Sequence, residues 1–320
     1  MKKIIIFLIL LLFFLGYTPY HELNGLAVVD TLGLEFKDNK YYLYLNVIND
    51  DNKVYSVNGD SLGEVFLKAK NIDNKKTYYN HLEVVILNTN AIDDKTLNFF
   101  KDEFTAIDYL MLSTKDELSN LFNTYHKRND YKSFIKKEKE ETASITNVTF
   151  KEFLSDSSDD IKDGYLPLIS YNERLISEGV YIPSKKVTLD NSLARASYLL
   201  NGNTDTYNTK FEINNVSYEV ILYDLKATIK YKDSNINIKI TGKIDSPDND
   251  DLSKLKSMSI KELENNIKDL IKSEQVNKYN ITNIINYIYL NKRELNYNDY
   301  INTDIMIKID LKQERKNNYG

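Results

Sequence analysis

Residues 84–112 of this 320-residue chain read VVILNTNAIDDKTLNFFKDEFTAIDYLML and contain the pattern that decides the fold of the N-terminal part. The first four and the last four of these residues are apolar runs with the length of buried strands. Asp93, between them, is a residue type that caps helices. Three apolar residues then recur on one helical face, namely Leu97, Phe100 and Phe104. Because a helix separates the two strands, they can run parallel through a right-handed crossover, which predicts a small α/β unit.

Strand and helix patterns continue on both sides of this unit. Upstream, the apolar run at 26–29 predicts a short buried strand that ends near Gly33, and the alternation at 43–47 predicts a half-buried strand. Downstream, apolar residues at helical spacing predict a second helix over 118–125. We therefore assign residues 19–140 to an N-terminal α/β domain.

The charge run Lys136–Glu141 marks the end of this domain. Its composition is that of a solvated helix end or linker, and we favour this interpretation over a binding site. Residues 141–205 follow, with an acidic loop at 156–163 and several short apolar runs. We assign them to a short middle domain.

The C-terminal residues, 206–320, show a different pattern. Apolar and polar residues alternate from position 216, change phase at Tyr223 and Asp224, and alternate again as far as position 231. A third alternating run follows at 236–240. These period-two patterns predict three consecutive antiparallel strands.

Two helices and a last strand complete the C-terminal domain. Ser259 and Glu262 have the spacing of a capping box, which predicts the start of an amphipathic helix, and a second apolar stripe at 281–288 predicts another helix. Residues 305–311 alternate as a strand does. The order β-β-β-α-α-β predicts a mainly antiparallel sheet with its helices on one face. The whole chain is thus predicted to be a multidomain α+β protein.

The first 18 residues have the layout of an export signal. Lys2 and Lys3 precede twelve apolar residues, Ile4–Leu15, and Gly16 follows them. A membrane-spanning helix needs about 20 apolar residues, so a run of twelve is more typical of a secretory signal. We predict that residues 1–18 are a signal peptide or a retained membrane anchor, and that the protein acts outside the cytoplasm.

Composition narrows the functional classes. The chain is 42% hydrophobic and 28% charged, as folded soluble proteins are. Its net charge is −5 and its basic residues are scattered, which argues against a nucleic-acid partner. The sequence contains no cysteine, which excludes thiolate catalysis and cysteine-ligated zinc.

The sequence offers no catalytic, cofactor-binding or metal-binding motif. The three histidines, His21, His81 and His126, lack the spacing of metal ligands, and no glycine-rich phosphate loop or G-x-S-x-G is present. The acidic loops that start at Asp156 and Asp245 do not place glycine and glutamate where an EF-hand requires them. We interpret these loops as polar turns, with an irregular calcium site as the alternative. We therefore predict a protein that is not an enzyme and has no cofactor or metal ion.

Segments across nearly the whole chain carry a resemblance to a known family. The opening His21–Glu35, HELNGLAVVDTLGLE, is followed by a tyrosine-rich strand, and further segments follow in order at 145–154, 165–169, 178–187 and 304–311. In this order they resemble Ger(x)C proteins, the C subunits of spore nutrient-germinant receptors. His21 replaces a basic residue of the family, and Glu35 stands where the family usually has aspartate.

The resemblance implies a sensory and assembly role without catalysis. Members of this family are lipoproteins on the outer surface of the inner spore membrane. They associate with two integral-membrane subunits, of A and B type, in a complex that triggers germination in response to nutrients. The resemblance therefore implies the same localisation, partners and role for this chain, and no catalytic residue is carried over.

The chain departs from the family at the lipid attachment site. Phe14, Leu15, Gly16 and Tyr17 occupy the lipobox, with Tyr17 where the acylated cysteine should be. Phe14 and Gly16 also replace the small residues that ordinary signal peptidase prefers. We therefore predict that the apolar segment is retained as an uncleaved anchor. The C-terminal region also looks shortened, at 291–303.

Two alternative functions remain open at this point. One is an exported solute- or surface-binding protein unrelated to germination, and the other is a secreted hydrolase whose site is assembled from distant residues. Neighbouring genes for two multi-pass receptor-type membrane proteins would favour the receptor subunit, and a permease gene would favour the solute-binding protein. A hydrogen-bonded Ser–His or carboxylate pair in a deep cleft would favour the hydrolase.

Overall fold

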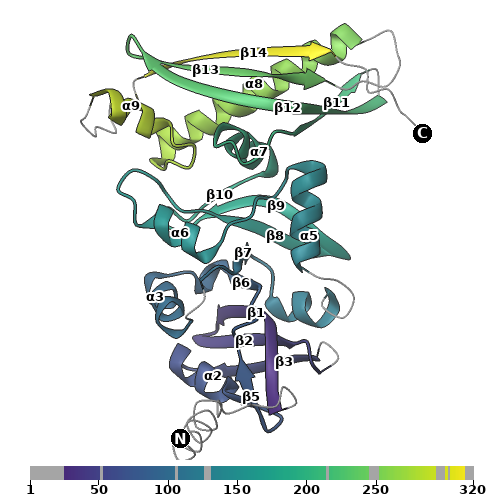
Figure 1. The fold of residues 1–320 in the computed structure, drawn as a ribbon, viewed down its shortest axis with the longest axis vertical. Coiled ribbons are helices and arrows are strands. Elements are labelled where there is room, and N and C mark those ends of the chain that lie inside the picture. Colours follow the sequence, from purple (N-terminus) through teal and green to yellow (C-terminus); the bar gives the residue numbers. More distant parts are fainter. Residues whose placement is uncertain are drawn as a thin grey trace, which may run out of the picture.

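The computed structural model describes most of the chain, namely residues 25–50, 53–104, 107–125, 131–213, 216–244, 252–292, 300–301 and 303–313. The predicted signal or anchor at 1–18 lies outside these residues. The described part is elongated, with β1 (Leu26–Lys37) near one end and β14 (Asp304–Gln313) at the other (Figure 1). Among the described residues, no helix combines the length and the apolar character needed to cross a membrane.

A ten-stranded sheet forms the larger part of the molecule. Its main path runs β10-β9-β8-β7-β6-β1-β2-β3, with a parallel centre from β8 to β1 and antiparallel flanks. The two short strands β4 and β5 join it through β1. The further strand bounds are β2 Lys40–Val47, β3 Lys53–Gly59, β4 Asn71–Ile72, β5 Lys75–Tyr78, β6 Val84–Asn88, β7 Leu110–Thr114, β8 Leu166–Asn172, β9 Arg174–Ile182 and β10 Val187–Leu189.

Helices cover both faces of the central strands. One hydrophobic cluster takes Val85 and Leu87 of β6, and a second cluster takes Val84 and Ile86 from the opposite face. The helices are α2 Leu62–Ala69, α3 Asp94–Glu103, α4 Leu118–Asn120, α5 Tyr131–Lys137 and α6 Phe150–Ser157, with a 3₁₀ turn at Thr89–Ala91 and π-helical turns at Leu121–Tyr125 and Glu138–Thr142. This double burial explains why residues 84–87 of β6 are an uninterrupted apolar run.

The predicted strand–helix–strand unit is confirmed. β6 and β7 pair in parallel, and α3 connects them. The Asp93 carboxylate accepts a hydrogen bond from the Thr96 backbone N–H at 2.7 Å, as expected of an N-cap. Phe100 and Phe104 are buried against the sheet.

Two strand predictions near the N-terminus need correction. The first strand does not end near Gly33 but runs on to Lys37, and the missing side chain of Gly33 leaves room for the Phe122 ring. The strand at 43–47 is buried on both faces rather than one, because Tyr44 stacks on Phe122 with a centroid distance of 5.5 Å. The polar Asn46 is also buried, and its side chain donates to Asp30 at 2.7 Å.

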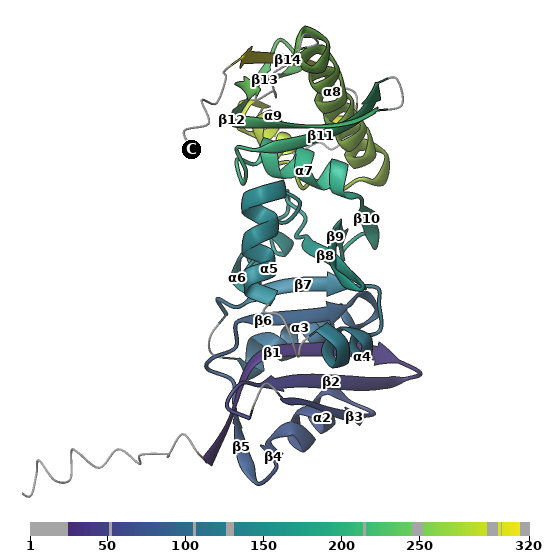
Figure 2. The same cartoon turned by 90° about the vertical axis from the view of Figure 1, so that its right-hand side faces the viewer.

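Strand pairing continues across the predicted boundary at residue 140. Ser113 and Thr114 of β7 pair with Leu168 and Ile169 of β8, so the strands of the predicted middle domain extend the large sheet. Figure 2 shows the strands β8 and β9 stacked above β7 and β6. The multidomain α+β class is confirmed, whereas the division at residue 140 stays a prediction.

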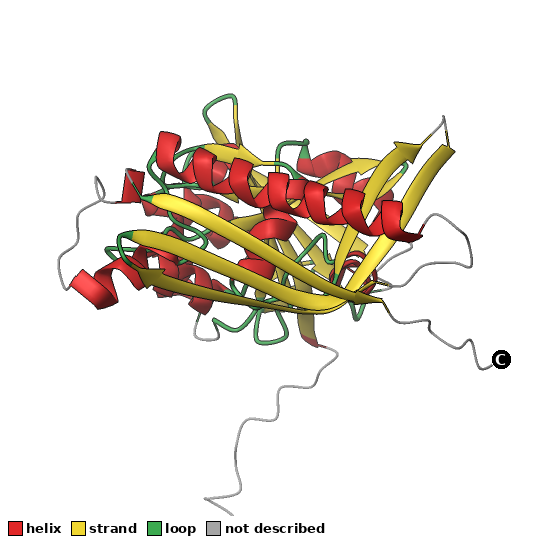
Figure 3. Cartoon of the chain, turned by 90° about the horizontal axis from the view of Figure 1, so that it is seen from above, coloured by secondary structure: helices red, strands yellow, loops and turns green. Residues whose placement is uncertain are grey.

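The C-terminal region forms a separate four-stranded sheet in the order β11-β12-β13-β14. β11 to β13 are antiparallel, and β14 is parallel to β13. The bounds are β11 Tyr207–Ile213, β12 Val216–Lys232, β13 Asn235–Ile244, α7 Asn191–Leu200, α8 Leu252–Asn277 and α9 Ile284–Lys292. The long helix α8 lies along one face of this sheet (Figure 3), as the order of elements predicted.

The predicted first and second strands of this sheet are in fact one strand. β12 spans both alternating runs, and a β-bulge between Tyr223 and Lys226 changes their phase, with Asp224 at φ 53°. A bulge adds one unpaired residue and so shifts the alternation as a turn would. The missing third strand is β11, which precedes β12.

Both C-terminal helices begin elsewhere than predicted. α8 starts at Leu252, so Ser259 is a buried mid-helix residue whose hydroxyl lies 3.1 Å from that of Thr209, not an N-cap. α9 starts at Ile284 rather than Ile281, because the backbone N–H of Ile281 donates to Glu274 instead of joining a helix.

Candidate functional site at the junction of the two sheets

Helix α7 connects the two sheets. Its N-cap, Asp190, accepts hydrogen bonds from the backbone N–H groups of Ser192 and Leu193 at 2.9 and 3.0 Å. The buried face of α7, which includes Tyr198 and Leu199, contacts β9 of the large sheet and β12 and α8 of the small one. The helix ends at Leu200 with Asn201 as its C-cap, and Gly202 then adopts φ 72°. α7 therefore packs against elements of both sheets.

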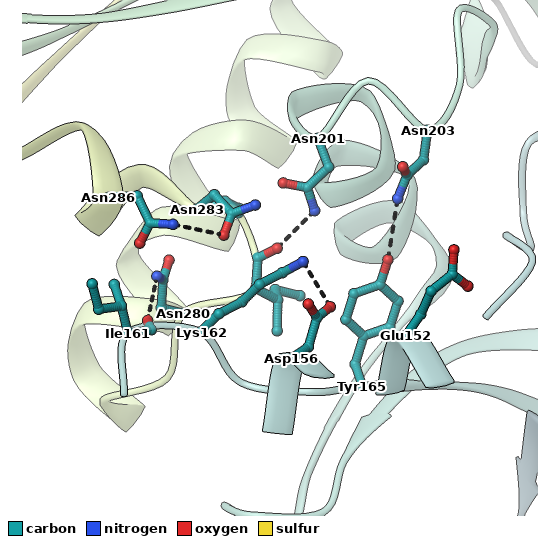
Figure 4. A network of polar contacts seen from close by, with 12 residues as sticks. Glu152, Asp156, Ile161, Lys162, Tyr165, Asn201, Asn203, Asn280, Asn283 and Asn286 are labelled. Carbon is teal, nitrogen blue, oxygen red and sulfur yellow. Dashed lines mark hydrogen bonds and ion pairs between the residues drawn. The ribbon is translucent and has the colours of Figure 1, made fainter. Parts of the chain in front are cut away.

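An asparagine-rich network joins the loop between α8 and α9, residues 278–283, to the rest of the molecule (Figure 4). Asn280 and Asp163 exchange two bonds of 2.9 Å, from each backbone N–H to the partner's oxygen. The Asn280 side chain also donates to the Ile161 carbonyl at 2.6 Å. Asn201, at the end of α7, donates to the Ile281 carbonyl at 2.7 Å. The network thus connects three segments that are far apart in sequence.

The acidic loop at 156–163 is held in place as one side of this network. Lys162 forms an ion pair with Asp156 at 2.6 Å, and Asp163 accepts a hydrogen bond from Ser184 at 2.6 Å. Tyr165, just after the loop, accepts a hydrogen bond from Asn203 at 3.3 Å. The loop that the sequence indicated as a polar turn therefore contacts the C-terminal domain.

A buried carboxylate fixes the other side of the loop at 278–283. Glu274, in the last turns of α8, accepts hydrogen bonds from Ile281 N, Thr282 N and Thr282 Oγ1 at 2.8 to 2.9 Å, and from Tyr300 OH at 2.5 Å. Burial raises the pKa of Glu274 to about 7, and the hydrogen bonds from Tyr300 and the loop oppose that shift. Lys278 and Asn283 bound the loop at φ 54° and 57°.

A polar cleft of about 600 Å³ opens on the same junction. Its walls come from α5 and the π-helical turn after it, from β9, from α7, and from β11 and β12. Ser144 donates to Glu138 at 2.6 Å, and Ser177 donates to the Ser144 carbonyl at 2.7 Å. Arg195 donates to the Asn208 carbonyl at 3.0 Å. The cleft is thus lined by acidic and by basic side chains, and strands of both sheets contribute to its walls.

The chemistry of this junction fits binding or conformational coupling. The histidine in the described part of the chain, His81, packs near Tyr78 with a ring distance of 6.0 Å and does not line the cleft. Within the described ranges, no group of three or more His, Cys, Asp or Glu side chains could hold a metal ion. The expectation of a protein without catalytic residues, cofactor or metal stays a prediction.

Sequence reasoning did not identify the junction residues. The predicted membrane-attachment residues, Phe14, Leu15, Gly16 and Tyr17, lie outside the described residues. The sequence does contain a signal for Glu274. This residue follows Ile267 and Leu270 on the apolar stripe of α8, where a charged residue is unexpected. For Asn280 and Asp163 no signal separates them from the many other polar loop residues.

Glu35, at which the chain departs from the resembled family, has a structural role. It is buried in β1, and its carboxylate accepts a hydrogen bond from the backbone N–H of Leu118, the first residue of α4, at 3.3 Å. Burial raises the pKa of Glu35, and the bond from Leu118 opposes the shift. The carboxylate therefore fixes the start of α4 against the large sheet.

Comparisons with known proteins agree with the fold and with the resemblance in sequence. A family model described as "Spore germination protein N-terminal domain" matches residues 19–171. Spore germination protein GerQC of Bacillus cereus is 24% identical over 311 residues, which cover 85% of this chain and 86% of that protein. Spore germination protein KC of Bacillus subtilis (strain 168) is 24% identical over 129 residues, covering 33% of this chain and 32% of that protein.

A solved structure shares the fold. The crystal structure of the GerBC protein matches with a TM-score of 0.55 at 12% identity, over 88% of this chain and 96% of that one. The matched family domain covers the large sheet from β1 to β8, and the GerBC match extends over both sheets. Together these matches support the resemblance of this chain to the Ger(x)C family of spore germination proteins.

Proposed function

We propose that this chain is the non-catalytic C-type subunit of a spore germinant receptor, exported and membrane-associated, that takes part in nutrient-triggered germination. One observation carries the proposal, namely the relation to spore germination protein GerQC over 85% of this chain. The family match at 19–171 supports the same role. The partners would be the two integral-membrane subunits of such a receptor, of A and B type.

The mechanism that fits this role is conformational coupling. A ligand that binds elsewhere in a complex can shift this subunit between states only if the states differ in free energy of interaction. The junction offers an element for such a change, because one loop donates hydrogen bonds to the carboxylates of Asp163 and Glu274 and accepts one from Asn201. A small displacement of that loop would change how the two sheets sit relative to each other.

A deletion and complementation experiment tests the role. Spores that lack the chain should lose the germination response to the nutrients read by its receptor, and the wild-type gene should restore it. A response of unchanged rate and extent in the deleted spores would refute the proposal. Germination by a nutrient-independent stimulus serves as the control for general spore damage.

Membrane attachment is tested separately. We propose that residues 1–18 remain attached as an anchor on the extracytoplasmic face of the membrane, because Tyr17 cannot be acylated as cysteine is. Mass spectrometry of the protein extracted from membranes should find the intact N-terminus. A mature terminus just after Gly16 would overturn the anchor and leave the receptor role untouched.

A further inference from the structure

Strand β14 is the longest edge strand in the described part of the chain. It ends the small sheet (Figure 1), and all ten of its residues pair with β13 without a β-bulge. The strands that end the main paths of the two sheets elsewhere are shorter, with seven residues in β3 and in β11 and three in β10. Natural proteins commonly interrupt a long edge strand with a bulge or a proline, because its free edge can pair with another strand. β14 contains neither.

The outer edge of β14 has no partner among the described residues. Along a strand, the backbone N–H and C=O groups of every second residue point to the same edge. Half of these groups in β14 therefore point away from β13. Apart from the ladder to β13, the backbone of residues 304–313 makes no hydrogen bond to another described residue. The outer edge can thus pair with one more strand.

The apolar row of β14 is only partly covered. On β13, the three isoleucines of the face that α8 covers are buried, whereas their register partners on β14 are partly exposed. The partners are Ile236 with Ile305, Ile238 with Ile307, and Ile240 with Ile309. A strand added beyond β14 would cover the exposed part of this row. That burial would stabilise the added strand, since it removes apolar surface from water.

A second copy of β14 is complementary to the first when the two strands run antiparallel. About a twofold axis through Ile309, Lys308 of each copy lies opposite Asp310 of the other, which makes two pairs of opposite charge. These charged residues are exposed on the face away from α8. On the covered face, Ile309 lies opposite Ile309 of the second copy, and Ile307 lies opposite Leu311 of that copy. Both faces of the paired strands are therefore matched.

The neighbouring symmetric registers are less favourable, because each places like charges opposite each other. An axis through Asp310 brings the two copies of that aspartate together, and an axis through Ile307 sets Asp304 against Asp310. An axis through Lys308 brings the two copies of that lysine together, which offsets the attraction between Asp304 and Lys312 in that register. The order of charges in β14 thus favours the one register in which only opposite charges meet.

We propose that two copies of this chain associate through β14, with the two strands antiparallel about Ile309, so that the two small sheets form one continuous sheet. The contact is symmetric and closes after two copies, so it predicts a dimer and not a filament. A strand from another protein would meet the same edge, but the reciprocal pairing of Lys308 with Asp310 is a property of two identical strands. The inference does not depend on the role in germination.

Cross-linking tests the register in the full-length chain in detergent. The chain contains no cysteine, so an introduced cysteine has no competitor. Met306 and Lys312 are exposed and lie opposite each other across the proposed axis. An equimolar mixture of Met306→Cys and Lys312→Cys chains should therefore form a disulfide between the two variants on oxidation. Each variant alone should not, because its two sulfurs would lie about 20 Å apart at roughly 3.3 Å a residue. Equal yields in the mixture and in the single variants would overturn the proposal.

A charge exchange tests the affinity, measured by sedimentation equilibrium of the full-length chain in density-matched detergent. Lys308→Asp or Asp310→Lys should each raise the dissociation constant of the dimer about tenfold, because one substitution creates two like-charge pairs. The double variant Lys308→Asp/Asp310→Lys should restore wild-type association, since opposite charges meet again. The matched control, Lys230→Asp, makes the same charge change at an exposed position of β12 and should leave the constant unchanged.

Recovery in the double variant separates a lost contact from a folding defect. A wild-type chain that sediments as a monomer at every concentration would overturn the proposal. A dimer that the single variants leave unchanged would do so too, because the contact would then lie elsewhere. The same holds for a double variant as weak as the single ones and for an equal loss in the control.

Discussion

The two sheets of this protein differ in how many of their faces are buried. In the large sheet all five residues of β6 are buried, because helices pack on both sides. In the small sheet the burial of β14 alternates residue by residue, because α8 covers one side only. The described part of the large sheet is therefore a core packed on both faces, whereas the small sheet leaves one face exposed.

The largest expected effect comes from shortening one apolar side chain in each sheet, one at a buried position and one at an exposed position. Ile86→Ala in β6 should lower the free energy of unfolding by about 3 to 5 kcal/mol, because it leaves a cavity at a fully buried site. Met306→Ala on the open face of β14 should change it by less than about 0.5 kcal/mol, since Met306 is 52% exposed. Urea unfolding of both variants measures the contrast. Similar losses at the two sites would contradict the comparison.

Glu274→Ala should have the next largest effect, a loss of about 2 to 3 kcal/mol. The substitution leaves the buried donors of Ile281, Thr282 and Tyr300 without their acceptor. Hydrogen exchange should accelerate in the loop at 278–283 before the rest of the small sheet. Asp269→Ala, a charge change on the same helix, is the control.

The pH dependence of stability tests the same carboxylate. Because burial raises the pKa of Glu274 above its unfolded value to about 7, its protonated form stabilises the fold. That contribution is complete below about pH 4.5 and is lost as the pH rises through about 7. The variant Glu274→Gln lacks the titration, so the stability difference between wild type and variant should shrink from pH 5 to pH 8.5. A difference that stays constant over this interval would show that the carboxylate is ionised throughout.

The same difference in burial explains which strands could be predicted from the sequence. A strand buried on both faces appears as an apolar run, as at Val84–Leu87, and a strand with one open face appears as an alternation, as at Ile305–Leu311. Both signals were local, and both predictions are confirmed. The bulge at Asp224 gives the same local signal as a turn, which is why one strand was predicted as two.

The junction could not be predicted because its contacts join distant parts of the chain. Asp163 and Asn280 are 117 residues apart, and neither has a local partner that would indicate the other. Ser259 shows the opposite error. Its local capping pattern predicts the start of a helix, but the residue lies inside α8 and its hydroxyl is hydrogen-bonded to that of Thr209 on β11. Long-range hydrogen bonds decide both positions.

Asp163→Ala should weaken the contact between the two sheets by about 1 to 2 kcal/mol. It removes the acceptor of the Asn280 backbone N–H and of the Ser184 hydroxyl, while the cores of both sheets stay intact. Asp160→Ala, in the same loop, is the control because Asp160 is exposed. Limited proteolysis should cut the loop at 278–283 faster in the first variant. Equal rates in both variants would show that Asp163 does not hold the junction.

The smallest expected effect has the opposite sign. Lys239→Thr on the exposed side of β13 removes the repulsion from Lys308 and puts a good strand former on an exposed site, so stability should rise by about 0.2 to 0.5 kcal/mol at low salt. The electrostatic part of the gain should vanish near 1 M salt, where the Debye length is about 3 Å. The control is Lys230→Thr, whose register partner is the neutral Asn237 and which should gain less. A loss of stability in Lys239→Thr would mean that the lysine supports the fold and that its repulsion from Lys308 is negligible.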